Sequence, residues 1–72
     1  MKAIINGLMY DTTNSKALYS SGEVTLWKTQ HGAYFMISHQ GIKPMSIDEV
    51  KEYLGVKDAD MYVAEFGEVE EA

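Results

Sequence analysis

The sequence predicts a single small α+β domain: an antiparallel meander of about five short strands, one capped α-helix packed on it, and a second short acidic helix. Three observations support this. The first half of the chain alternates strand-forming runs with turn signals. A complete helix start follows Pro44. The 72 residues suffice for only one core. We assign residues 1–67 to the domain and 68–72 to an acidic, frayed tail.

The first two strands are predicted at residues 2–5 and 8–10. The Asn-Gly pair between them is the strongest short hairpin signal in a sequence. The polar cluster at residues 11–15 is typical of a turn in which side-chain oxygens accept hydrogen bonds from nearby amides. Residues 16–20 form the third predicted strand.

A central hairpin is predicted within residues 22–41, with its two strands joined at residues 30–32. Side chains alternate between the two faces of a strand. The face beneath the first helix is expected to hold Val24, Leu26, Phe35 and Ile37. The opposite face is expected to hold Trp27, Tyr34 and Met36. Because neither face is polar, both need cover from the rest of the chain or from another molecule.

The first helix is predicted over residues 47–54. Ser46 and Glu49 have the spacing of a capping box, and Gly55 occupies the position of a terminating glycine. The helix is short and must gain stability by packing on the sheet. Its apolar stripe is expected to contain Ile47, Val50, Leu54 and Tyr53.

Residues 59–66 fit two structures. The segment alternates like a strand, and it also has the spacing of a helix capped by Asp58 and ended by Gly67. Local propensity does not decide between them.

Charge is unevenly distributed. Residues 1–45 carry a net charge of +2 and residues 46–72 a net charge of −7, and the chain contains no arginine. Since phosphate contacts dominate affinity for nucleic acids, direct nucleic-acid binding is not expected. An acidic face could instead meet a basic protein surface or imitate a phosphate backbone, or its charges could simply solvate a helix. The candidate acidic face consists of Asp48, Glu52, Asp58, Asp60 and Glu65.

No residue pattern indicates catalysis. The chain has no cysteine, no glycine-rich phosphate loop and no nucleophile motif. Its two histidines, His31 and His39, have no acidic or cysteine neighbour at metal-ligand spacing. We therefore expect no enzyme activity, no cofactor and no metal site. The absence of cysteine and of a long apolar run suggests a cytoplasmic chain with no membrane segment.

Several motifs carry a resemblance. NGLMYDT at residues 6–12, TLWKTQHGAYFM at 25–36, the capped helix, and FGEVEEA at 66–72 are similar to those of a family of small uncharacterised proteins. These occur in bacteria, largely Firmicutes, and on their phages and mobile elements. The resemblance covers most of the chain, implies a helix at residues 59–66, and implies no established activity. Longer relatives have a segment before the central hairpin and a glycine-rich stretch after it, both shortened here.

These observations together predict a small protein-binding module, plausibly encoded by a phage or mobile element, that inhibits or modulates a host or defence protein. Its candidate interface is the aromatic face formed by Trp27, Tyr34 and Met36. Burial of that face by the C-terminal segment is the alternative. Two other functions are considered: a structural homo-oligomer, and, with least support, a nucleic-acid accessory protein.

Overall fold

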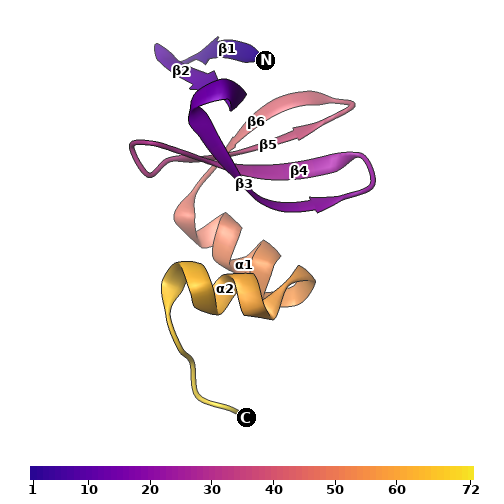
Figure 1. The fold of residues 1–72 in the computed structure, drawn as a ribbon, viewed down its shortest axis with the longest axis vertical. Coiled ribbons are helices and arrows are strands. Elements are labelled where there is room, and N and C mark those ends of the chain that lie inside the picture. Colours follow the sequence, from indigo (N-terminus) through magenta and orange to yellow (C-terminus); the bar gives the residue numbers. More distant parts are fainter.

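The chain folds into three layers stacked along its longest dimension (Figure 1). The computed structural model describes all 72 residues and measures 40 × 26 × 18 Å. An N-terminal hairpin lies at one end, a four-stranded sheet in the middle, and two helices at the other end. The predicted α+β class is confirmed, with six strands in place of about five.

The N-terminal hairpin is formed by β1 (Lys2–Ile5) and β2 (Leu8–Asp11), which pair antiparallel. Asn6 and Gly7 both have positive φ, 53° and 79°, as a type I′ turn requires. The hairpin is a sheet of its own, so the expected single meander is divided into two sheets.

A short 3-10 turn, η1 (Thr12–Asn14), connects the hairpin to the central sheet. The Asp11 carboxylate accepts hydrogen bonds from the Thr13 amide at 3.0 Å and from the Asn14 side chain at 3.3 Å. This confirms that side-chain oxygens satisfy backbone groups in the predicted turn.

The central sheet has four antiparallel strands in sequential order. They are β3 (Ser15–Ser21), β4 (Val24–Thr29), β5 (Tyr34–Ser38) and β6 (Gly41–Met45). Strand β6 was not predicted, because Pro44 indicated the end of strand structure. An edge strand tolerates proline, because some backbone amides of such a strand face solvent and make no hydrogen bond to the sheet.

The register of the central hairpin overturns the predicted division of its faces. Around the loop of residues 30–32, the Thr29 amide donates a hydrogen bond to the Ala33 carbonyl at 2.8 Å, and the Gly32 amide donates one to the Thr29 carbonyl at 3.1 Å. Leu26 therefore lies opposite Met36, and Trp27 lies opposite Phe35. Directly opposite residues share a face, so the expectation that Phe35 lies with Leu26 is wrong.

The main core lies between the central sheet and the helices. A bulge between Ala17 and Tyr19 breaks the alternation of β3, so that both Leu18 and Tyr19 pack toward the helices. The buried residues of this core are Leu18, Leu26, Tyr34, Val50 and Leu54.

Helix α1 (Ile47–Lys57) begins with the predicted capping box. The Ser46 hydroxyl accepts a hydrogen bond from the Glu49 amide, and the Glu49 carboxylate accepts one from the Ser46 amide. It does not end at Gly55 but continues to Lys57. A Cβ atom added at Gly55 would lie 3.9 Å from the Tyr62 ring, an ordinary contact distance. Ile47, expected in the apolar stripe, is exposed.

Residues 59–66 are a helix, α2 (Ala59–Phe66), which resolves the ambiguity of the sequence. Asp58 begins it by accepting the Met61 amide at 3.1 Å, and Gly67 ends it. Residues 68–72 lie outside any helix or strand. Neither helix has the length and apolar character needed to cross a lipid bilayer.

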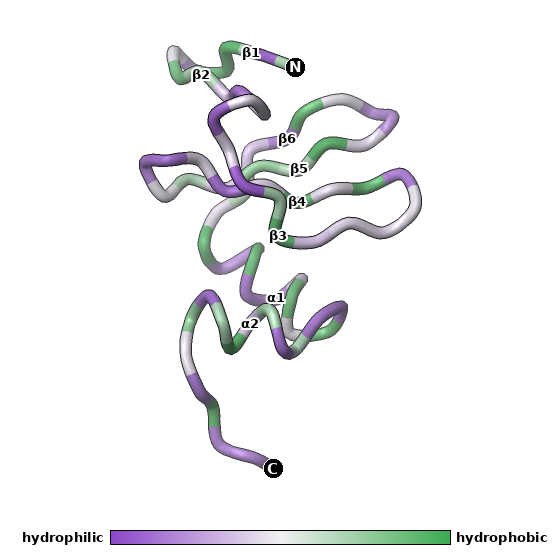
Figure 2. The backbone as a smooth tube through the Cα atoms, in the orientation of Figure 1, coloured by the Kyte–Doolittle hydropathy of each residue, from purple (hydrophilic) through white to green (hydrophobic).

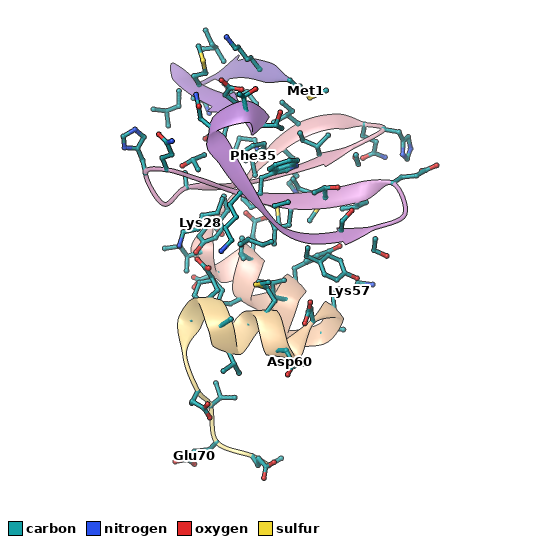
Figure 3. All side chains as sticks on the ribbon, in the orientation of Figure 1. Met1, Lys28, Phe35, Lys57, Asp60 and Glu70 are labelled. Carbon is teal, nitrogen blue, oxygen red and sulfur yellow. The ribbon has the colours of Figure 1, made fainter.

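The N-terminal hairpin covers the other face of the sheet. Phe35 is fully buried there, with the Tyr10 ring edge-on at 5.4 Å and the Trp27 ring stacked at 6.2 Å. Figure 3 shows Phe35 and Lys28 on opposite sides of the sheet, Phe35 toward the hairpin and Lys28 toward the helices. The sheet is thus covered on both faces from within the chain.

Candidate functional site

The predicted interface of Trp27, Tyr34 and Met36 is not one surface. Tyr34 is buried and Met36 half-buried on the helical side of the sheet, whereas Trp27 is half-buried on the hairpin side. The Trp27 indole nitrogen is enclosed and has no hydrogen-bond partner. The structure therefore provides no common aromatic face for a partner at these three residues.

Tyr34 is covered by helix α2 through a polar cluster. Its hydroxyl donates a hydrogen bond to the Glu65 carboxylate at 2.6 Å, and the Lys28 ammonium forms an ion pair with the same oxygen. The Lys28 Nζ atom also lies 5.8 Å from the centre of the Tyr34 ring. The Phe66 ring packs beside Tyr34 at 6.0 Å.

The pKa values in this cluster follow from its burial and its charges. Burial, followed by the hydrogen bond to the Glu65 carboxylate and its charge, raises the pKa of Tyr34 to about 12. Burial favours a higher pKa for Glu65, but the hydrogen bonds from Lys28 and Tyr34 and the charges of Lys28 and Lys16 outweigh it. The pKa of Glu65 is therefore lowered. The cluster holds a carboxylate charged and fastens α2 to the sheet.

No local pattern in the sequence indicates this cluster, because Lys28 and Glu65 are separated by 37 positions. It also removes Glu65 from the predicted acidic face. Asp58 is likewise occupied, as the cap of α2. The remaining members, Asp48, Glu52 and Asp60, are exposed on two different helices.

The exposed apolar side chains point to a different surface. Seven large apolar residues are mostly exposed, and four of them belong to the N-terminal hairpin or the residue before it. Their exposed fractions are 65% for Met1, 68% for Ile4, 60% for Leu8 and 56% for Met9. Figure 2 shows hydrophobic colour along this hairpin at the end of the molecule far from the helices.

The register of the hairpin explains this exposure. Ala3 lies opposite Tyr10, and this pair shares the face that packs on the sheet. Ile4 lies opposite Met9, and this pair shares the other face. We use the name outer hairpin face for the exposed apolar surface of this pair together with Leu8 and Met1, which are exposed at the ends of the strands although alternation places them on the side of Ala3 and Tyr10. Alternation along the strands thus places large apolar side chains on both faces of a two-stranded sheet, of which only one is covered.

The hairpin also has open strand edges. Edges of the central sheet carry features that discourage pairing: the bulge in β3, and Pro44 and Lys43 in β6. Strand β1 has no bulge or proline. The Thr12 amide donates to the Met1 carbonyl at 3.0 Å. Because hydrogen-bonded pairs alternate in an antiparallel ladder, the backbone groups of Lys2 and Ile4 face the open edge.

His31 and His39 lie in separate turns, and the His39 Nδ1 atom is 3.2 Å from the Glu23 carboxylate. No group of three or more histidine, aspartate or glutamate side chains is placed to hold a metal ion.

Comparisons of the chain with protein-family models, with curated proteins and with solved structures find no match. Function is therefore inferred from the surfaces described above.

Proposed function

We propose that this chain is a small, non-enzymatic protein-binding module and that the outer hairpin face is its contact surface. The observation that carries the proposal is the concentration of exposed apolar side chains on one short hairpin. Contiguous apolar surface on a small protein commonly marks a contact with another protein.

The chemistry of the outer hairpin face suits such a contact. Met1 and Met9 have flexible, polarizable side chains that adapt to the shape of a partner. Ile4, opposite Met9 on strand β1, adds a rigid apolar side chain. A partner could therefore cover apolar side chains and pair with the free backbone groups of the same strand.

The resemblance to proteins of phages and mobile elements supports a more specific form of the proposal. A small acidic protein from such a setting would act by binding a host or defence protein and inhibiting or modulating it. This part rests on the resemblance alone and names no partner.

The experiment is affinity capture from bacterial lysate with three forms of the chain. The wild type is compared with Ile4→Thr/Met9→Thr, which removes the apolar side chains but keeps residues suited to strands. The matched control is Ile47→Gln/Val56→Gln, which removes exposed apolar side chains from helix α1. Circular dichroism establishes that all three are folded.

We expect a stoichiometric partner that is retained by the control and lost by the hairpin variant. A partner that the hairpin variant retains at full strength would contradict the assignment of the surface. Capture of no partner by the wild type would contradict the binding function itself.

A second candidate function, a structural homo-oligomer, is favoured by the open edge of β1, which could pair with β1 of another copy. Light scattering over a range of concentrations separates the two. A stable oligomer together with an empty capture would support self-assembly, and a monomer would exclude it.

A further inference from the structure

A second apolar surface lies at the opposite end of the molecule, on the pair of helices. A shallow groove of about 290 Å³ is lined by Gly55 of α1, by three residues of α2 and by one residue of the tail. The α2 and tail residues are Ala59, Tyr62, Val63 and Val69. Gly55 has no side chain and Ala59 has only a methyl group, so neither residue fills the groove.

The surroundings of this helical groove are acidic. Residues 58–72 contain six acidic residues and no lysine or arginine. Asp58 caps α2 and Glu65 is paired with Lys28, which leaves four acidic side chains facing solvent. They are Asp60, Glu68, Glu70 and Glu71. Figure 3 shows Asp60 and Glu70 at the same end of the molecule.

These acidic residues flank the groove in the sequence. Ala59 is followed by Asp60, and Val69 lies between Glu68 and Glu70. The nearest lysines are directed elsewhere: Lys51 lies over the Phe66 ring at 5.4 Å, and Lys57 lines a separate groove with Met45. Two of the residues that line the groove, Ala59 and Val69, thus have exposed acidic neighbours in the sequence, and residues 58–72 contain no lysine or arginine.

We infer that this helical groove binds an amphipathic, basic helix of a partner protein. An apolar stripe with anchors three and four residues apart would enter the groove, and lysines or arginines beside the stripe would face the carboxylates. A neutral apolar segment would leave those charges without partners, and an acidic one would be repelled. This inference does not depend on the proposed function, since the two surfaces lie at opposite ends of the molecule.

The test uses a synthetic amphipathic helix of leucine and lysine as the probe and a matched peptide with glutamate in place of lysine. Binding of the labelled peptides is followed by fluorescence anisotropy at several salt concentrations. Val69→Gln removes a mostly exposed apolar side chain from the tail, outside any helix or strand, and Val63→Gln removes one from α2. Glu68→Gln/Glu70→Gln removes charge, and Leu8→Gln on the hairpin is the control.

We expect the lysine peptide to bind and the glutamate peptide not to bind. Val63→Gln and Val69→Gln should each weaken binding, by roughly tenfold where the apolar side chain is fully covered. Glu68→Gln/Glu70→Gln should weaken binding and reduce its dependence on salt, and Leu8→Gln should leave it unchanged.

Three results would overturn the inference. The first is failure of the lysine peptide to bind the wild type. Binding that falls with the loss of charge but is unchanged in both valine variants would show attraction to net charge without a groove. Binding that is lost in Leu8→Gln would assign the peptide to the hairpin.

Discussion

The helical layer and the N-terminal hairpin cover opposite faces of the same sheet, but different interactions hold them. Two helical side chains, Val50 and Leu54, are buried against three from β3, β4 and β5, and the Lys28–Glu65–Tyr34 cluster adds a charged attachment. The hairpin is attached chiefly by Tyr10 on Phe35. The helices are thus attached to the sheet by more interactions than the hairpin, and the hairpin leaves large apolar side chains exposed.

The largest expected contrast is between two leucines. Leu26→Ala opens a cavity at a fully buried position between sheet and helices and should lower the free energy of unfolding by about 2–5 kcal/mol. Leu8→Ala, on the exposed hairpin, should change it by no more than about 0.5 kcal/mol. Urea denaturation measures both. Equal losses would mean that the two layers contribute alike.

A smaller and more local effect is expected for Tyr10→Ala. Removing the ring separates the hairpin from Phe35 and should lower the free energy of unfolding by about 1–3 kcal/mol. Hydrogen exchange should become fast at the amides of residues 2–11 while those of α1 remain protected. If protection falls uniformly along the chain, the hairpin is an integral part of the core.

The charged attachment of α2 should respond to acid. The pKa of Glu65 is lowered in the folded chain, so its contribution to stability is present above its ordinary pKa of 4.5 and is lost as pH falls through the lower folded value. At neutral pH, Glu65→Gln should cost about 1 kcal/mol, since Lys28 is partly exposed.

The wild type should therefore lose more stability on acidification below about pH 5 than Glu65→Gln does. Thermal unfolding at a series of pH values measures the difference. Parallel curves for the two proteins would show that the ion pair does not contribute to the attachment.

The smallest effect is expected at Gly55. Because this glycine lies inside α1 with helical backbone and its added Cβ would meet Tyr62 at an ordinary 3.9 Å, Gly55→Ala should stabilise the fold by about 0.5–1 kcal/mol. A rise in melting temperature would confirm it. A fall would indicate that α2 requires the glycine for closer contact.

Local signals in the sequence predicted much of the fold. The Asn6-Gly7 turn, the capping box of Ser46 and Glu49, and the cap at Asp58 each act within a few residues, so their patterns are visible in the sequence. Features that depend on distant strands were missed. The bulge beside Leu18 and the strand containing Pro44 are stabilised by pairing that local propensity does not record.

The candidate site was predictable only in part. The sequence predicted a β-hairpin at residues 2–10 but not that one of its faces lacks cover. The predicted faces of Trp27, Tyr34 and Phe35 were wrong because the two strands were combined without using the loop length to determine their register. A three-residue loop at 30–32 places the residues directly before and after it opposite each other. Counting back along both strands from that pair places Trp27 opposite Phe35.

Site-specific photo-crosslinking tests the central claim, that the outer hairpin face contacts another protein. One variant carries photo-reactive benzoylphenylalanine in place of Met9, and a second carries it in place of Gln40, an exposed residue in the turn between β5 and β6. We predict a discrete crosslinked protein from position 9 and none from position 40. The same product from both positions, or a product from position 40 alone, would contradict the assignment.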